Sequence, residues 1–443
     1  MKYTVFPLGI ILFVFSSCAS SSSGLSKSSS TPPENSYSEF FGLVDYDNMH
    51  TDGSYNQADY SRNGKTYTYT AEDISGNALA SKISLLSKGD TLILDGSKGV
   101  FNLKTTKFSK SNITIKGINN AVLDFSSTST YSKKQIDAAI EGVRAQSKAG
   151  NGHYLKTYNS EMAKNLGNGY GLYMTGNHNI IQDIVIQNAS DNGLIIATGG
   201  NYNIIRNVEA RFCGDAGIQL NGSSTAPVDC PEEYTKDGPH HNKFFDCYSH
   251  NNCDSWNLGE NADGFAVKAG AGDFNYFENC RAEYNSDDGW DCYRVRGSVT
   301  WVNCEANYNG LCQTTGDNWA EYSNGNGFKV GGGATKGKFN GKIINSPSLH
   351  RHAQYLKGCS ATGNRGNSGV GFDRNNQHGS VYLVDCFATD NHATLLRDNS
   401  SSYRHDDYAF GSYGNKCYVL RCFTGLSSDT VNGNYEGDKI SVK

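Results

Sequence analysis

A glycine followed by an apolar residue recurs through the middle of this chain at intervals of 22, 24 and 25 residues, with longer gaps that indicate insertions. The pairs are Gly171-Leu172, Gly193-Leu194, Gly217-Ile218, Gly264-Phe265, Gly289-Trp290, Gly327-Phe328 and Gly371-Phe372. A fixed period of this length is typical of a solenoid in which each repeat forms one coil. Short apolar stretches bounded by Gly, Asn, Asp and Ser indicate strands rather than helices. We therefore predict an all-β fold, a right-handed parallel β-helix.

The residues after each glycine alternate between the two faces of the expected strand. The residue directly after the glycine should point into the coil, because successive side chains of a strand point to opposite faces. The residue after that should point outward. This places one outward column along the helix: Tyr173, Ile195, Gln219, Ala266, Asp291, Lys329 and Asp373. Asp291 and Lys329 are therefore predicted to be neighbours along the axis.

Two short acidic runs coincide with this repeat, Asn261-Ala262-Asp263-Gly264 and Ser286-Asp287-Asp288-Gly289-Trp290-Asp291. Asp263 precedes Asp287 by 24 residues, about one coil, and residues one coil apart stack at ~4.8 Å. We expect the four carboxylates of Asp263, Asp287, Asp288 and Asp291 to converge. Two carboxylates ~5 Å apart repel by roughly 3 kcal/mol at an effective dielectric near 20, so the cluster calls for a cation. An all-oxygen donor set is best suited to Ca²⁺.

A purely structural interpretation competes with this one. Asp-Gly and Asn-Gly pairs are common turn residues, and we interpret Asp191 and Asp215 in that way. A lone outward lysine is usually only solvated. The shared register of the acidic residues and Lys329 is what favours a site over a set of turns.

The remaining sequence predicts features around the coils. Ala80–Leu86 is predicted as an amphipathic helix that caps the N-terminal end, and Ile136–Gln146 as a helix within an insertion. One recurring inward position is predicted to hold a small buried residue in successive coils: Cys247, Cys280, Cys304, Cys359, Cys386 and Cys422. Cys213, Cys230 and Cys253 surround an insertion at 222–240 and could include a disulfide. Another loop is expected at 309–325. The net charge of −5 gives no indication of nucleic-acid binding.

The N-terminus resembles an export signal. Lys2 precedes a short apolar core from Val5 to Phe15, which is too short to span a bilayer. Cys18 follows it in the manner of a bacterial lipoprotein, so residues 1–18 are predicted as a signal with Cys18 lipidated. Residues 19–38 are predicted as a serine-rich flexible tether, and 39–443 as one catalytic β-helix domain. We expect a monomer at the bacterial cell surface or outer membrane, attached only through this lipid, with ordinary cleavage and secretion as the alternative.

The ordered motifs resemble those of family 9 polysaccharide lyases, the pectate lyase type. They are Asn261-Ala262-Asp263-Gly264-Phe265, Asn285-Ser286-Asp287-Asp288-Gly289-Trp290-Asp291, Gly325-Asn326-Gly327-Phe328-Lys329 and Gly371-Phe372-Asp373-Arg374-Asn375-Asn376. The resemblance covers about 170–390. It implies that Asp263, Asp287, Asp288 and Asp291 bind Ca²⁺ and that Lys329 is the catalytic base.

The expected function follows from that resemblance, namely calcium-dependent cleavage of polygalacturonate by β-elimination. In such a reaction the cation stabilises charge that develops beside the uronate carboxylate. A neutral lysine then takes the C5 proton, so we expect an alkaline pH optimum. Because an anionic polysaccharide needs cations near the site, we predict substrate contacts at Lys268, Arg294 and Arg374. Asn375, which follows Arg374 in the last motif, is also predicted to contact substrate. Arg374 stands where the alternation expects an inward residue.

Two alternatives from other classes remain. A pectin-degrading hydrolase on the same fold would use a carboxyl pair rather than a lysine, and the chain lacks the Gly-His-Gly and Arg-Ile-Lys runs expected of such enzymes. A non-catalytic, glycan-binding β-helix with structural Ca²⁺ would have the same fold. The choice between homogalacturonan, rhamnogalacturonan and another uronic-acid glycan, and between endo and exo action, stays open.

Overall fold

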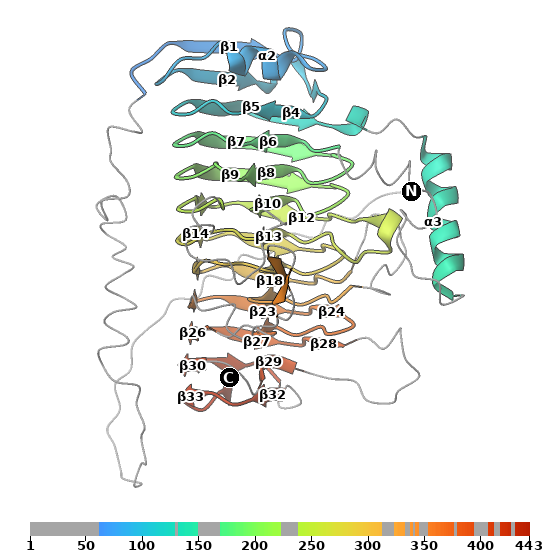
Figure 1. The fold of residues 1–443 in the computed structure, drawn as a ribbon, viewed down its shortest axis with the longest axis vertical. Helices are drawn as coiled ribbons and strands as arrows, with labels where there is room; N and C mark the ends of the chain where they lie inside the picture. Colours follow the sequence, from blue (N-terminus) through green and yellow to red (C-terminus); the bar gives the residue numbers. More distant parts are fainter. Residues whose placement is uncertain are drawn as a thin grey trace, which may run out of the picture.

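The computed structural model describes residues 62–128, 132–148, 169–222, 238–311, 323–332, 337–339, 342–344, 353–375, 379–393, 406–411, 417–426 and 430–443. Over these residues the chain winds into a stack of coils whose strands form long parallel sheets (Figure 1). The predicted signal and tether (1–38), including Cys18, lie outside the described residues, as do 39–61.

One strand of most coils contributes to a ten-stranded sheet, here called the first sheet. Its strands are, in spatial order, β4 (Thr106–Phe108), β6 (Leu172–Met174), β8 (Leu194–Ala197), β10 (Ile218–Asn221), β13 (Phe265–Lys268), β16 (Trp290–Asp291), β19 (Phe328–Lys329), β25 (Phe372–Asp373), β29 (Asp406–Gly411) and β32 (Thr430–Gly433). All of these neighbours pair in parallel. The predicted register of the glycine anchors is confirmed along this sheet.

The other two sides of the coils belong to one 20-stranded sheet with two branches. The second side is β1 (Thr66–Thr70), β2 (Thr91–Asp95), β5 (Thr114–Asp124), β7 (Ile180–Gln187), β9 (Ile204–Arg211), β11 (Lys243–Phe245), β14 (Asn275–Glu278), β17 (Val299–Val302), β22 (Gln354–Lys357), β26 (Val381–Val384), β30 (Cys417–Leu420) and β33 (Glu436–Gly437). The third side is β3 (Phe101–Asn102), then the C-terminal parts of β5, β7 and β9, then β12 (Tyr248–His250), β15 (Arg281–Glu283), β18 (Glu305–Asn307), β23 (Ser360–Thr362), β27 (Phe387–Thr389), β31 (Phe423–Thr424) and β34 (Ser441–Val442).

Short elements complete the described structure. Helix α2 (Ala78–Ser84) lies at the N-terminal end of the stack and buries Leu79 and Ile83 (Figure 1). Helix α3 (Lys133–Lys148) lies at the side of the stack (Figure 1). Both confirm predicted helices, with slightly different ends. The others are η3 (Gly96–Lys98), η4 (Ser126–Thr128), η5 (Ser255–Asn257), the antiparallel pair β20 (Gly337–Phe339) and β21 (Lys342–Ile344), and the parallel pair β24 (Arg365–Gly366) and β28 (His392–Ala393). Among the described residues, no helix combines the length and apolar character needed to cross a membrane.

Aromatic rings from successive coils fill the interior behind the first sheet. The ring of Trp290 stacks on Phe265 at 4.1 Å between centroids and on Phe328 at 5.7 Å, and Phe328 stacks on Phe372 at 5.1 Å. These side chains are 0–3% exposed. Each is the residue directly after an anchoring glycine, so the predicted inward direction is confirmed. Burial of such large apolar surfaces is the main stabilising term of a solenoid core.

The corner between the second and third sides explains the recurring cysteine. The residue before each one has a positive φ, for example 52° at Asn279 and 50° at Asn303, a conformation that Asn and Asp tolerate better than most residues. The chain then turns the next side chain inward, and all six predicted cysteines are free and at most 1% exposed. Cys213 and Cys253 are also free, so they form no disulfide with each other; Cys230 lies outside the described residues.

A ladder of buried asparagines holds the turns that precede the first sheet. The backbone N–H of Asn285 donates to the side-chain oxygen of Asn309 at 3.2 Å, and that of Asn309 to Asn364 at 3.0 Å. Glycine is required beside this ladder, since a Cβ on Gly289 would lie 2.8 Å from the Asn309 amide nitrogen. Because Asn285 lies two residues before Asp287, the ladder fixes the backbone of the second acidic run.

Candidate active site

The outward column of the first sheet brings Asp291 and Lys329 together. Asp291 of β16 pairs with Lys329 of β19 in register, Ala266 of β13 precedes them, and Asp373 of β25 follows. The alternation after each glycine predicts the face that these two side chains share, and the order of the glycine anchors predicts that they lie in adjacent coils. The register of β16 and β19 confirms both predictions.

Three of the four predicted carboxylates form one compact group. Oxygens of Asp263, Asp288 and Asp291 lie within 4.8 Å of one another, and the three residues are at most 3% exposed. The backbone N–H of Asp288 donates to Asp263 Oδ1 at 3.2 Å, and that of Asn326 donates to Asp288 Oδ1 at 2.7 Å. We call these three residues the acid triad.

Asp287 lies beside the acid triad but not within it. Its Oδ1 accepts a hydrogen bond from the backbone N–H of Asn324 at 2.7 Å, and its side chain points to the turn before β19. A metal-binding role for Asp287 stays a prediction, and the bond of its Oδ1 helps to hold the neighbouring coil.

Two lysine ammonium groups pair with the acid triad. Lys329 Nζ lies 2.9 Å from Asp288 Oδ2 and 3.4 Å from Asp291 Oδ1. Lys268 Nζ lies 2.6 Å from Asp263 Oδ2 and 2.9 Å from Asp291 Oδ2. Burial acts to lower the pKa of each lysine, but the surrounding carboxylates outweigh it and raise both pKa values well above the ordinary range.

The carboxylates respond to burial and to these neighbours in opposite directions. Burial raises the pKa of Asp263 and of Asp288, and the like charges around them add to it. Burial also opposes ionisation of Asp291, yet the two ammonium groups on either side of it lower its pKa. Lys268 and Lys329 act against this rise at Asp263 and Asp288, so three carboxylates share two ammonium groups at this point.

The donor set fits a hard divalent cation. All of its atoms are carboxylate oxygens, and Asp263 Oδ2 and Asp291 Oδ1 are buried without a hydrogen-bond partner apart from the ion pairs with lysine. Ca²⁺ takes six to eight oxygen ligands, commonly supplied by carboxylates together with water or substrate. Asp263, Asp288 and Asp291 are the residues that could hold it.

The other predicted substrate contacts fall in different places. Arg294 is half-buried in the turn after β16, with its guanidinium 5.1 Å from the ring centre of Tyr293. The backbone N–H of Asn375 donates a hydrogen bond to Asp373 Oδ1 at 2.6 Å. The substrate contacts of Arg294 and Asn375 stay predictions.

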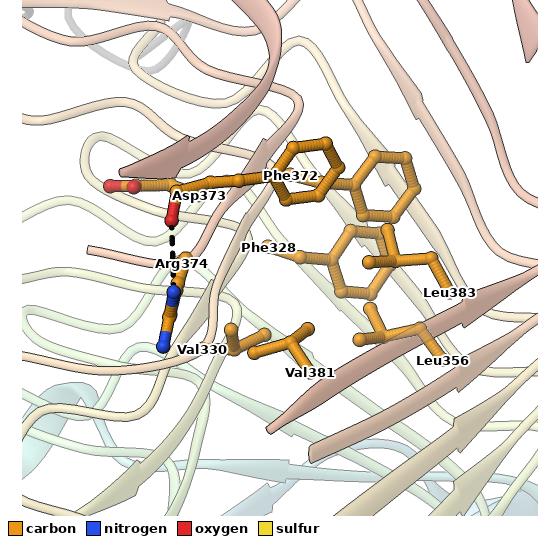
Figure 2. A pocket seen from close by; sticks show the side chains of 9 residues that line it. Phe328, Val330, Leu356, Phe372, Asp373, Arg374, Val381 and Leu383 are labelled. Carbon is orange, nitrogen blue, oxygen red and sulfur yellow. Dashed lines mark hydrogen bonds between the residues drawn. The ribbon is translucent and has the colours of Figure 1, made fainter. Parts of the chain in front are cut away.

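Arg374 differs from its predicted role. Its side chain is 4% exposed, lines an interior cavity of about 10 Å³ with Phe328 and Phe372 (Figure 2) and donates to the carbonyl of Phe410 at 3.3 Å. The alternation of faces explains this placement, because Arg374 occupies an inward position. A guanidinium inside the coil is not placed to meet a polysaccharide.

Two residues near Lys329 were given no role in the predicted site, although Asp373 belongs to the predicted outward column. Tyr293 is 39% exposed, and a Cβ on Gly332 would lie 3.1 Å from its ring and 3.8 Å from Lys329 Cε, so Gly332 separates the two side chains. Asp373 follows Lys329 in register, and its carboxyl pKa is raised to about 6, mainly by burial. The same alternation rule could have identified Tyr293, since it stands two residues after the outward Asp291.

A second acidic pair lies toward the N-terminal end. Burial raises the pKa of Asp191 well above its usual value, as does the neighbouring carboxyl of Asp215. Each of the two side chains accepts a hydrogen bond from the next backbone N–H, Asp191 from Asn192 at 2.9 Å and Asp215 from Ala216 at 2.7 Å. These bonds agree with the prediction that both are turn residues.

The fold and the site together define an elongated parallel β-helix with a buried acid–lysine centre on one sheet. The model of a protein family described as "Pel9A-like, right handed beta helix region" matches residues 58–405, and the chain belongs to this family. The predicted fold class, including its hand, and the predicted family are thereby confirmed.

Similar proteins carry related names. The chain is 31% identical over 271 residues to pectate lyase L of Paenibacillus polymyxa (strain SC2). This alignment covers 59% of this chain and 51% of that protein. For pectate lyase L of Dickeya chrysanthemi the identity is 28% over 267 residues, with the same coverage. The chain thus spans about half the length of these curated relatives.

Solved structures share the fold. The crystal structure of pectate lyase Pel9A matches with a TM-score of 0.58 at 20% identity and covers 87% of this chain and 81% of that one. A rhamnogalacturonan lyase matches with a TM-score of 0.54 at 18% identity and covers 86% of each chain.

Proposed function

We propose that this protein is a calcium-dependent polysaccharide lyase that cleaves polygalacturonate by β-elimination. The observation that carries the proposal is the placement of Lys329, which is in register with Asp291 and ion-paired with Asp288 at the edge of the acid triad. The names of the family and of the relatives support the class of reaction. Because a rhamnogalacturonan lyase has a similar fold, we retain rhamnogalacturonan as the alternative substrate.

The residues have distinct tasks in this proposal. The acid triad would hold Ca²⁺, and the bound ion would supply positive charge that stabilises the negative charge developing on the uronate carboxylate of the substrate. Lys329 Nζ removes the proton from C5, the C4–C5 double bond forms and the bond from C4 to the glycosidic oxygen breaks; the leaving oxygen takes up a proton from water. The lysine can remove the C5 proton only when neutral, and the carboxylates that surround it raise its pKa. Activity is therefore expected to rise toward alkaline pH.

The partner of the protein follows from the same chemistry. We propose an anionic polysaccharide bound along the outward column, with Lys268 and Arg294 as cationic contacts. We also propose export of the chain, as a monomer, with membrane attachment only through a lipid on Cys18 or with release into the medium.

The test is a comparison of wild-type protein with Lys329→Ala on polygalacturonate and on rhamnogalacturonan. The ultraviolet absorbance of the unsaturated product should appear with wild-type protein and calcium, and disappear with a chelator or with Lys329→Ala. Polysaccharide binding by the variant should persist. Reducing ends without the ultraviolet signal would indicate the hydrolase, and binding without any product would indicate the non-catalytic alternative.

A further inference from the structure

Lys268 connects two members of the acid triad with its side chain. It is the last residue of β13 and lies two positions after the outward Ala266, so it projects on the same face. Its ammonium contacts Asp263 Oδ2 at 2.6 Å and Asp291 Oδ2 at 2.9 Å. The group that would hold calcium therefore already contains a cation of the protein itself.

We propose that Lys268 is an internal counter-cation that competes with calcium for the acid triad, and that calcium binding releases its ammonium group toward the preceding coil. This proposal rests on the calcium site of the proposed function. It makes Lys268 a positioning residue that sets the metal affinity, in addition to its predicted contact with substrate.

Competition follows from the shared oxygens. Calcium–oxygen distances are 2.3–2.6 Å in proteins, and an ion within that distance of Asp263 and Asp291 would lie close to an ammonium that contacts the same two carboxylates. Like charges at such separation repel strongly in a buried site. The side chain of Lys268 is 17% exposed, compared with 8% for Lys329, so Lys268 has the more open path away from the ion.

The structure also provides an acceptor for the released ammonium. Asn221 of β10 pairs with Lys268 in register, one coil toward the N-terminus. Its side-chain oxygen is buried and has no hydrogen-bond partner. The Asp215 carboxylate is near enough to interact electrostatically with Lys268. In the proposed release the lysine ammonium exchanges two carboxylates for an amide oxygen of the adjacent coil that has no donor.

The first experiment measures calcium affinity by isothermal titration calorimetry at one pH and one salt concentration. Lys268→Met keeps the apolar stem and removes the charge, so calcium should bind about tenfold more tightly or better than to wild-type protein. Lys268→Arg keeps the charge and should leave the affinity near that of wild-type protein. Lys107→Met is the matched control, because Lys107 projects from the same sheet at β4, four strands away from β13.

The results separate the two proposals. If Lys268→Met binds calcium with equal or weaker affinity than wild-type protein, the competition is refuted. Wild-type protein that binds no calcium would refute the metal site of the proposed function, and the role of Lys268 with it. An increase in affinity is a readout that mere structural damage would not produce.

A second measurement uses wild-type protein alone and so does not depend on the folding of a variant. Amine-reactive labelling followed by mass spectrometry should show Lys268 labelled several-fold faster with calcium than with a chelator, while Lys107 changes little. Labelling of Lys268 that is unchanged or slower with calcium would overturn the proposed release.

Discussion

Asp373→Asn is expected to shift the pH dependence of activity without removing a proposed metal ligand. Asp373 follows Lys329 in register, and its Oδ1 accepts the backbone N–H of Asn375 at 2.6 Å. Asparagine keeps the shape and the acceptor oxygen. The substitution therefore removes one negative charge beside the proposed base and little else.

The size of the attraction between Asp373 and Lys329 follows from the strand spacing. Two groups one coil apart are ~5 Å from each other, and at an effective dielectric near 20 the attraction between unit charges is roughly 3 kcal/mol. That energy corresponds to about 2 units of pKa at most. Asp288, which lies 2.9 Å from Lys329 Nζ in the wild-type protein, remains in the variant, so only about half of this energy is expected to be lost. The pKa of Lys329 should fall accordingly.

The direction in which the pH profile moves depends on whether Asp373 itself is ionised. Its pKa is raised to about 6 by burial, and nearby Lys329 acts in the opposite direction. Above pH 6 the carboxylate is charged and holds the proton on Lys329, so its removal makes the base available at lower pH. Below pH 6 Asp373 is protonated in wild-type protein, and the two proteins should converge.

The assay is the rate of unsaturated product formation with saturating calcium, measured from pH 5 to 11. The rising limb of log kcat/KM should lie about 1 unit lower in Asp373→Asn than in wild-type protein. Asp385→Asn serves as control, because Asp385 pairs with Arg421 on the exposed surface. A limb that stays in place, or moves to higher pH, would refute the assignment of Lys329 as the titrating base.

Three further predictions address stability and binding. Asp191→Asn should raise the Tm at pH 8 and change it little at pH 4. The pKa of Asp191 is raised in the folded state, so the wild-type protein loses stability as the pH rises above the ordinary carboxyl pKa of about 4. Thermal melts at both pH values check this, and a lower Tm of the variant at pH 8 contradicts it. Trp290→Ala should lower the free energy of unfolding by about 3–5 kcal/mol, since the ring is 1% exposed between Phe265 and Phe328; a loss below 1 kcal/mol in denaturant titration would be inconsistent with a tightly stacked core. Tyr293→Ala should raise KM several-fold and change kcat less, because the exposed ring lies beside Lys329; steady-state kinetics measure both, and an unchanged KM would exclude a contact with substrate.

Much of the site could be predicted because a parallel β-helix converts sequence spacing into spatial order. The glycine anchors set the register, and alternation after each anchor sets the face, so the proximity of Asp291 and Lys329 follows from counting residues. The buried aromatic stack and the cysteine column follow in the same way. In this fold, neighbours along the axis are neighbours by period.

Side-chain contacts between coils could not be predicted by counting. The period alone predicts that four carboxylates converge; three of them form the acid triad, and Asp287 accepts a hydrogen bond from the turn before β19 with its Oδ1. Arg374 is predicted to reach substrate because of its charge, whereas the interior offers it the carbonyl of Phe410. Lys268 is predicted as a substrate contact, and the structure pairs it with Asp263 and Asp291.

The coils, their register and the column that carries Asp291 and Lys329 follow from the amino-acid sequence, because glycine spacing and strand alternation are local properties of the chain. The membership of the acid triad and its pairing with ammonium groups became visible only in the folded protein. The physical reason is that ion pairs in a buried site depend on side-chain rotamers and desolvation. Both are set only when adjacent coils pack against each other.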